Sequence, residues 1–403
     1  MTERVVLVSP RGFCAGVVRA IAAVERALEL YGPPVFVRRA IVHNSHVVER
    51  LAAAGAVFVN ELDEVPRESV VVLSAHGVAA SVYEEARARG LRVVDATCPL
   101  VAKVHREVKR FSGLGFDVIL IGQSGHDEVV GTLGQAPGVR LVEDAGDASS
   151  LRGIDPDRVA CVTQTTLGVQ DIAPVIAALR TCFPQLVEPG VADICYATRN
   201  RQAAATWLGG TVDVVLVVGD RTSSNSRHLR DAASATGTPA YLIGSVTELQ
   251  DEWIRDARVV GVSAGASTPE QLVADVVTHL CRDGATLHDE VFVEERVTFP
   301  LPRALMSQAQ SAGSLDAAQV RDAGSALIGR MLRIRIDERG RPDVDASAPL
   351  TLARRGITFG AVAVTRDLAR HGIDLERLLD RVTTAGAVVD RTDEIGRVRI
   401  DIE

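Results

Sequence analysis

Short apolar runs alternate with helical patterns along most of the chain. Each run ends in small polar residues, and apolar positions with the spacing of an amphipathic helix follow it. The runs are rich in Val, Leu and Ile without strict alternation, which is typical of strands buried on both faces of a parallel sheet. The six clearest runs begin at Val5, Val70, Asp117, Val159, Asp213 and Val259.

Strands that alternate with helices predict parallel α/β sheets. The six runs pair off over residues 1–98, 99–193 and 194–281, which are segments of similar length. We therefore predict an α/β fold of three related parallel-sheet domains around a shared centre. Residues 282–305 would form a segment that closes this part of the chain.

Residues 306–403 differ from the rest of the chain. They contain no cysteine and begin with a small, polar stretch that resembles a linker. Strand patterns begin at Met331 and Arg397, and helical patterns begin at Ile357 and Asp374. We expect a small α/β appendage, with no signature of a phosphate loop, a metal cluster or a nucleophile. The sequence leaves its role open, and a solvated extension or an oligomer contact is the plainest interpretation.

Composition and charge narrow the class of protein. Hydrophobic residues make up 47% of the chain and aromatic residues only 4%, so Val, Leu, Ile and Ala must build the cores. The net charge is −8, the only lysines are Lys103 and Lys109, and no basic block occurs, which argues against binding to nucleic acid. No apolar run is long enough to span a membrane. With no signal-peptide pattern at the start, we expect a cytoplasmic protein.

Six cysteines in a cytoplasmic protein are more often free, metal-binding or catalytic than disulfide-bonded. Cys14, Cys98 and Cys195 each precede an amphipathic helix, and one comes from each expected domain. A thiolate at a helix N-terminus meets unpaired N–H groups and the positive end of the helix dipole, which favours ligation of a metal or cluster. Cys161, Cys182 and Cys281 are interpreted as small buried hydrophobic residues instead.

The cysteine spacing restricts the kind of centre. No CxxC pair exists, which excludes zinc-ribbon and ferredoxin patterns. Three thiolates without a fourth would leave one iron of a cubane cluster open, and an open metal binds substrate and acts as a Lewis acid.

Polar residues gather where the predicted strands end. Ligands of parallel α/β sheets bind beyond these carboxyl ends, and hydroxyl, amide and imidazole donors near helix N-termini suit an anion such as a diphosphate. Glu128 follows His126 by two residues, and a carboxyl group in a closed, dry pocket gains a raised pKa and can donate a proton. The other polar candidates are His43, His76, Thr165, Thr166, Ser223, Ser224, Asn225 and Ser267.

A set of segments resembles one known family in content and in order. They are PRGFCAGV, VHN, SAHGV, DATCPLVAKVH, GHDEVVGTLGQ, TQTTL, DICYATRNRQ, VVGDRTSSNS and GVSAGAS. Over roughly residues 1–305 the chain resembles 4-hydroxy-3-methylbut-2-enyl diphosphate reductase, an iron–sulfur enzyme of isoprenoid synthesis.

The resemblance implies a pseudo-threefold arrangement of the three domains around a [4Fe–4S] cluster with one open iron. Cys14, Cys98 and Cys195 would be the ligands. Glu128, helped by Thr165 or Thr166, would deliver a proton to the substrate hydroxyl. The residues that would hold the diphosphate are His43, His76, His126, Ser223, Ser224, Asn225 and Ser267.

The implied reaction is the last step of the methylerythritol phosphate pathway. Two electrons from ferredoxin or flavodoxin would reduce the allylic diphosphate, and protonation at either end of the allyl fragment would give isopentenyl or dimethylallyl diphosphate. One departure stands out, because the family commonly has proline where this chain has Asp127. Loss of that proline puts the stiffness of the Glu128 loop in question.

Two other functions fit parts of the pattern. Quinolinate synthase is also a three-domain α/β protein with a three-cysteine cluster, but the Ser-Ser-Asn and Glu-bearing segments favour the diphosphate reductase. A non-catalytic iron–sulfur sensor, with the appendage as its interaction module, would need no acid or anion-binding set.

Overall fold

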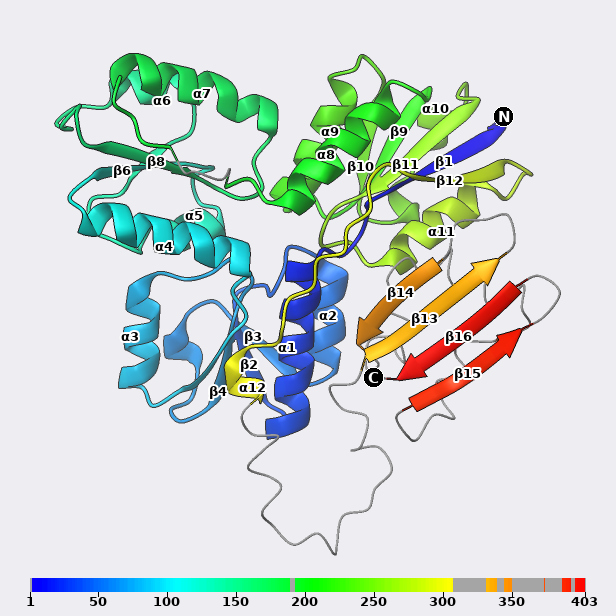
Figure 1. Cartoon of the computed structure of the whole chain (residues 1–403), viewed down its shortest axis with the longest axis horizontal. Coiled ribbons are helices and arrows are strands. Elements are labelled where there is room, and N and C mark those ends of the chain that lie inside the picture. The colour runs from blue at the N-terminus through cyan, green and yellow to red at the C-terminus, as the bar shows by residue number, and fades with distance from the viewer. Residues whose placement is uncertain are drawn as a thin grey trace, which may run out of the picture. The chain divides into compact units, whose positions relative to one another are not determined.

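The computed structural model describes residues 2–188, 193–306, 331–338, 344–349, 373, 386–392 and 396–402. Contacts divide the chain into two compact units, one of residues 1–268 and 276–310 and the other of 269–275 and 311–403. The first unit contains three parallel sheets with helices packed on them, which confirms the predicted fold class (Figure 1). Among the described helices, none combines the length and apolar character that a membrane crossing requires.

The first sheet has the strand order β3-β2-β4-β5. Its helices include α1, which contacts β2 and β4. The strands are β2 (Val35–Arg38), β3 (Ala56–Val59), β4 (Val70–Leu73) and β5 (Arg92–Asp95), and the helices are α1 (Ala15–Tyr31), α2 (Ser45–Ala53) and α3 (Ala80–Ala88).

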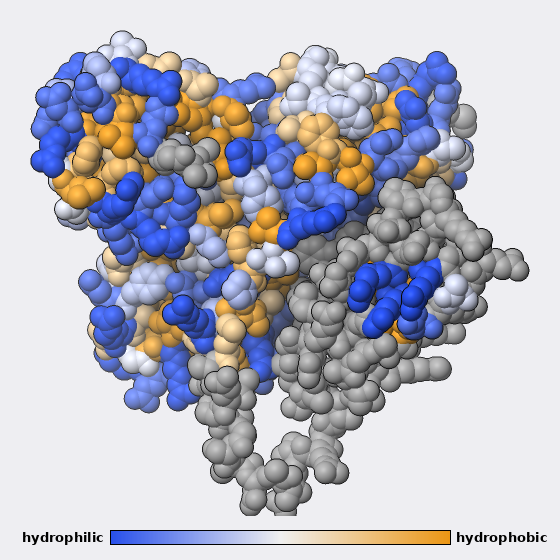
Figure 2. All heavy atoms as spheres, in the orientation of Figure 1, coloured by the Kyte–Doolittle hydropathy of each residue, from blue (hydrophilic) through white to orange (hydrophobic). Residues whose placement is uncertain are grey.

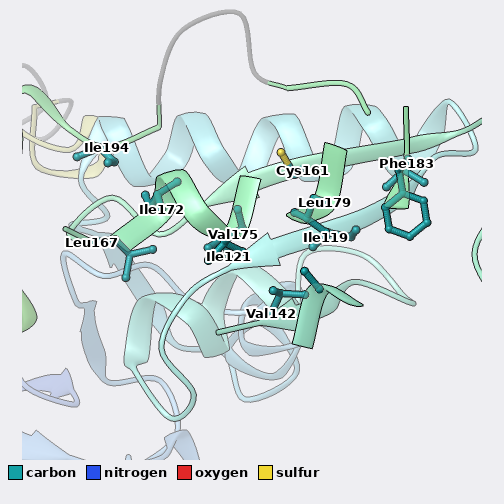
Figure 3. Close-up of a cluster of buried hydrophobic side chains, with 12 residues drawn as sticks. Ile119, Ile121, Val142, Cys161, Leu167, Ile172, Val175, Leu179, Phe183 and Ile194 are labelled. Atoms are coloured by element: carbon teal, nitrogen blue, oxygen red, sulfur yellow. The ribbon is translucent and has the colours of Figure 1, made fainter. Parts of the chain in front are cut away.

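The second sheet has the order β7-β6-β8, and α4 packs on β6 and β8. One side of this sheet forms an apolar core with α7, in which Cys161 lies fully buried in a cluster of aliphatic residues and Phe183 (Figure 3). The elements are α4 (Pro99–Gly113), β6 (Asp117–Ile121), α5 (Asp127–Leu133), β7 (Arg140–Val142), α6 (Ala145–Ser150), β8 (Val159–Thr163) and α7 (Val169–Cys182).

The third sheet has the order β10-β9-β11-β1-β12. Its elements are β1 (Arg4–Ser9), α8 (Tyr196–Gly209), β9 (Val214–Val218), α9 (Ser224–Ser234), β10 (Ala240–Ile243), α10 (Asp251–Ile254), β11 (Val259–Ala264), α11 (Glu270–Leu280) and β12 (Thr286–Val291). The short helix α12 (Arg303–Met306) follows.

The strand β1 does not belong to the sheet formed by the rest of residues 1–98, in contrast to the expected division at residue 98. Residues Val5 to Val8 are buried, and β1 pairs in parallel with both β11 and β12. An apolar strand of this kind suits an interior position, where both faces are covered. The N-terminal strand therefore joins the sheet of residues 214–291, while the helix that follows it packs on the first sheet.

The second unit differs in strand direction from the first. Four antiparallel strands form a sheet of order β14-β13-β16-β15. The strands predicted from Met331 and Arg397 are confirmed, and two further strands were not predicted. The helices expected from Ile357 and Asp374 lie outside the described residues. The strands are β13 (Met331–Glu338), β14 (Val344–Pro349), β15 (Gly386–Thr392) and β16 (Gly396–Ile402).

Two of the remaining cysteines are less buried than expected. Cys182 is the last residue of α7 and is exposed, and Cys281 is only partly buried. The expectation of a buried hydrophobic role holds for Cys161 alone. A helix end turns residues toward solvent even where the neighbouring sequence is apolar, which explains Cys182.

Candidate active site

Three cysteines occupy the same position relative to a helix. Cys14, Cys98 and Cys195 are the residues immediately before α1, α4 and α8, and all three are free thiols. Pro99 opens α4, where its missing N–H costs nothing and its fixed φ suits the first turn. The sequence pattern thus becomes three thiols at three helix N-termini.

Each of these cysteines also donates its backbone N–H to a loop that follows a strand. The bonds run from Cys14 to the carbonyl of Ala266 at 3.1 Å, from Cys98 to Ala75 at 2.9 Å, and from Cys195 to Thr165 at 3.1 Å. Ala266 precedes Ser267 and Ala75 precedes His76, so every acceptor is a predicted pocket residue or its neighbour. Backbone hydrogen bonds therefore join each thiol segment to the polar pocket.

The three sulfur atoms face one another closely enough to interact. A methyl group on Gly16 would lie 2.8 Å from Sγ of Cys98 and 3.7 Å from Sγ of Cys14, so both sulfurs look onto the same bare glycine. Burial raises the pKa of Cys98 to about 12 and of Cys195 to about 11, and the neighbouring thiol of Cys14 adds to both shifts. Three crowded thiols need a cationic centre to be ionised together, which fits a ligand set for iron.

Three histidine rings form a compact group beside the ends of the first two sheets. The rings of His43 and His76 stack with centroids 4.1 Å apart, and His126 lies 5.0 Å from the first ring and 5.9 Å from the second. Burial lowers the pKa of each, to about 4 for His126. All three are therefore neutral near pH 7 and offer N–H donors rather than positive charges.

The hydrogen bonds assign the proton of one ring. His126 precedes α5, and its Nδ1 accepts the backbone N–H of Glu128 at 3.2 Å. The neutral ring must then carry its proton on Nε2. That nitrogen is buried and has no partner among the described residues, as is true of Nε2 of His43 and Nδ1 of His76.

The loop after β9 supplies further polar groups without partners. Ser223 caps α9 by accepting the N–H of Ser226 at 3.3 Å. The hydroxyl of Ser224 and both amide atoms of Asn225 are buried and find no partner among the described residues. Because buried polar groups are nearly always satisfied, these atoms and the imidazole nitrogens indicate a polar ligand that the pocket is built to bind.

Two hydrogen bonds hold the His43 loop against loops of the third sheet. Ser267 donates its hydroxyl to the carbonyl of His43 at 2.9 Å, and Ser45 donates its backbone N–H to Asp220 at 3.1 Å. Ser267 is thus engaged with the backbone of a neighbouring pocket residue.

Glu128 lies fully enclosed between α5 and the loop after β8. Its carboxylate accepts the backbone N–H of Thr165 at 2.6 Å and the hydroxyl of the same residue at 3.0 Å. Burial is the largest influence and raises the pKa of Glu128 to about 7, against the opposing effect of these hydrogen bonds. The hydroxyl of Thr166 instead accepts a bond from Gln164 at 2.9 Å, so the structure places Thr165, of the two threonines, on the acid.

Several supporting residues were not predicted from the sequence. Lys103 of α4 contacts Asp193 at 2.8 Å, and Asp193 also accepts the N–H of Thr163. This pair ties the helix that follows Cys98 to the segment just before Cys195. No local motif marks it, because the partners are far apart in the chain and meet only in the fold.

Asp127 forms an ion pair with Arg39, which also contacts Glu61 at 2.9 Å. Ligating atoms of His43, His76 and Asp127 lie within 4.8 Å of one another, an arrangement that also suits a cation. The guanidinium on Asp127 already supplies its counter-charge, which favours the interpretation as an anion pocket. The ion pair restrains the loop at the position where the resembling family has proline.

Asp127→Asn is expected to raise the KM for substrate about two- to fivefold with kcat changed less than twofold, since a partly exposed ion pair contributes only up to about 1 kcal/mol. Asp127→Pro should restore the lower KM, because proline at the first helical position fixes the same turn. Steady-state kinetics of both variants test this. If the KM of the proline variant exceeds that of the asparagine variant, the charge of Asp127 and not the stiffness of the loop is what this position contributes.

Gly131→Ala is expected to lower kcat/KM about 10- to 100-fold, because α5 lies directly on the His76 loop. The added methyl would lie 2.9 Å from the carbonyl oxygen of Gly77, a backbone atom that cannot rotate away. The acid on α5 and His76 would then separate. Gly113→Ala is the matched control, since nothing lies within 4 Å of a methyl there. Unchanged kinetics for Gly131→Ala would refute this account of the packing.

Comparison with known proteins gives a consistent result. Residues 5–281 match the family described as LytB protein, and residues 330–403 match the C-terminal domain of YvlB-like proteins. The 4-hydroxy-3-methylbut-2-enyl diphosphate reductase of Azoarcus sp. is 52% identical over 305 residues, which cover 75% of this chain and 98% of that protein. The enzyme of the same name from Acidothermus cellulolyticus is 50% identical over 314 residues, which cover 77% of this chain and 92% of that protein.

Solved structures agree with the sequence relatives. The E-1-hydroxy-2-methyl-but-2-enyl-4-diphosphate reductase from Plasmodium falciparum superposes with a TM-score of 0.75 at 34% identity, covering 78% of this chain and all of that one. A family match over most of the chain, together with relatives that share half of their residues with it, leads to one conclusion. The chain belongs to the LytB family of 4-hydroxy-3-methylbut-2-enyl diphosphate reductases.

Proposed function

We propose that this chain reduces (E)-4-hydroxy-3-methylbut-2-enyl diphosphate to isopentenyl diphosphate and dimethylallyl diphosphate, the last step of the methylerythritol phosphate pathway. Family membership supports this activity. The observation that carries it here is the meeting, around one pocket, of three crowded thiols, an enclosed carboxyl group and unpartnered buried donors.

The reaction requires two electrons and two protons for each substrate. One proton and the allylic hydroxyl leave together as water, and the second proton is added to carbon at one end of the allyl fragment. The residues must therefore bind a diphosphate, hold an acid beside the hydroxyl and keep water away from the reduced fragment.

The diphosphate is bound by neutral donors. One ring nitrogen each of His43, His76 and His126 and the polar groups of Ser224 and Asn225 lack partners among the described residues, and with the proton on those nitrogens an anionic oxygen would satisfy them. Charge-assisted hydrogen bonds of this kind are about twice as strong as neutral ones. Ser223 and Ser267 shape the pocket through the helix cap and the His43 carbonyl that they contact, and their hydroxyl oxygens would complete the set that holds the diphosphate.

Glu128 is the proton donor to the substrate hydroxyl. With a pKa of about 7, the carboxyl is protonated in a large fraction of molecules at neutral pH. Thr165 holds both carboxyl oxygens, which fixes the orientation of the acid. Thr166 supports the same loop through Gln164 and does not touch the acid.

The family binds a [4Fe–4S] cluster, and Cys14, Cys98 and Cys195 would hold it here through three of its irons. When bound, the cluster supplies electrons one at a time and an open iron that acts as a Lewis acid toward the hydroxyl oxygen. We assign ferredoxin or flavodoxin as the electron donor and the cytoplasm as the location.

Anaerobic purification followed by iron and sulfide analysis, Mössbauer spectroscopy and a turnover assay with reduced methyl viologen tests the proposal. Four irons with one distinct site and formation of both isomeric products are expected. A zinc-only protein would refute it. A cluster without turnover of the allylic diphosphate would instead favour a sensor or an enzyme of the quinolinate synthase type.

A further inference from the structure

A cavity of about 440 Å³ lies at the start of α4, next to one of the three thiol segments. Thr97 and Pro99, the two residues on either side of Cys98, both line it. Three arginines also line it, namely Arg19, Arg106 and Arg303. The cavity therefore brings positive side chains to the backbone that carries a proposed cluster ligand.

Arg19 stabilises the cavity lining through three hydrogen bonds to backbone carbonyls. Its guanidinium donates to the carbonyl of Thr97 at 3.0 Å and to that of Asp95 at 3.3 Å. It also donates to the carbonyl of Pro300 at 2.8 Å, so the closing segment and the Cys98 loop share one arginine. Arg19 is consequently a structural part of the cavity, whereas Arg106 is exposed.

The outer face of α4 extends the positive charge beyond the cavity. We define the α4 basic surface as Arg106, Lys109 and Arg110, which are exposed and spaced so that they share one face of the helix. The helix carries four basic residues and one acidic residue, Glu107, which is turned toward Lys103. Hydrophilic side chains cover much of the region over α4 in the space-filling view (Figure 2).

This concentration of charge is unusual in the chain. The net charge is −8, yet both lysines of the sequence lie on α4. An acidic protein would be repelled by the molecule as a whole and attracted by this face, which favours encounter in one orientation. Because Arg106 belongs to both this face and the cavity, the favoured orientation brings the partner to the cavity beside Cys98.

We propose that the α4 basic surface and the adjoining cavity are the docking site of an acidic one-electron carrier protein. The inference rests on the proposed function, because a reductase of this kind needs two electrons for each turnover. Each docked carrier loses one electron to the bound cluster, and two successive carriers are oxidised for each substrate reduced. A carrier docked at the cavity would contact Thr97 and Pro99, the neighbours of the proposed ligand Cys98.

A second cavity lined by arginines lies away from the three cysteines and is not proposed as a docking site. It measures about 410 Å³ and is lined by Arg221, Arg227 and Arg230 together with an aromatic pair. Two of these arginines are paired with acids, Arg221 with Glu248 and Arg230 with Asp231. None of its lining residues adjoins Cys14, Cys98 or Cys195, so it supplies the matched control.

The test compares two reductants on the holoenzyme. The double variant Arg106→Gln/Lys109→Gln should raise the KM for a reduced acidic ferredoxin about three- to tenfold and weaken its dependence on salt. Turnover driven by reduced methyl viologen should not fall, because this small radical cation needs no protein docking surface. The cluster absorbance should match that of the parent chain.

The control double variant Arg230→Gln/Arg255→Gln removes the same charge, from Arg230 of the second cavity and from Arg255, an exposed residue at the C-terminal end of α10. It should leave the carrier KM within twofold. Equal carrier kinetics for the α4 variant and the parent chain would overturn the proposal, as would an equal loss in the control. A parent chain that turns over with neither reductant would instead refute the proposed function. If ferredoxin fails but viologen works in the parent chain, an acidic flavodoxin takes its place in the same comparison.

Discussion

Cys98→Ser is expected to lower turnover by at least about 100-fold and to reduce the iron and sulfide content of the anaerobically purified protein. Cys98 sits before α4 with its sulfur facing that of Cys14 across Gly16. A serine oxygen at this position is a harder and less readily ionised ligand than a thiolate. Iron and sulfide analysis, the cluster absorbance and a viologen-driven assay measure the effect.

Cys182→Ser is the matched control for this change, because Cys182 is an exposed free thiol at the end of α7. It should keep both the cluster and the activity. A Cys98→Ser protein that keeps four irons and full turnover would show that the Cys98 thiol is not a cluster ligand. The proposed mechanism would then be refuted.

Glu128→Gln is expected to reduce kcat about 10²- to 10⁴-fold while leaving the cluster spectrum unchanged. Glutamine fills the same space but carries no transferable acidic proton. Because the pKa of Glu128 is raised to about 7, its acid form is present below that pH and is lost as the pH rises through it. The kcat of the parent chain should therefore fall above about pH 7, and the small residual rate of the variant should not follow this profile.

The two threonines after β8 provide the internal comparison for the acid. Thr165→Val removes a hydroxyl that contacts Glu128, and Thr166→Val removes one that contacts Gln164. The first should lower kcat more than the second. An unchanged cluster spectrum with normal kcat in Glu128→Gln would move the proton-donor role to another group.

Most of the parallel-sheet framework could be predicted from local pattern. All six predicted strands exist, because four or five consecutive apolar residues mark an interior strand clearly. The three-residue strand β7 was missed, since so short a run does not stand out from a buried helical turn. The strand β3 was missed although it is as long as β4, so length alone does not separate predicted from missed strands. The pairing of β1 with β11 was also missed, because it joins residues about 250 positions apart and leaves no local trace.

The candidate site divides in the same way. A cysteine before a helix is a local signal, so the positions of Cys14, Cys98 and Cys195 could be predicted, whereas their convergence depends on long-range packing. The choice of Thr165 over Thr166 depends on which hydroxyl faces α5, and two adjacent identical residues cannot be told apart by sequence. The pairing of Lys103 with Asp193 likewise exists only in the folded chain.

Three backbone hydrogen bonds join the cysteine N–H groups to the loops at Ala75, Thr165 and Ala266. They would couple iron binding at the thiols to diphosphate binding in the polar pocket. If these sulfurs hold the proposed cluster, a displacement of one of them on losing iron would reach His76, Ser267 or Thr165 through a single hydrogen-bonded peptide group. Reciprocity of coupling free energies then requires that a bound diphosphate change the affinity for iron by the same factor by which bound iron changes the affinity for the diphosphate. With positive coupling, a supply of substrate in a growing cell would protect the metal centre of the enzyme that consumes it.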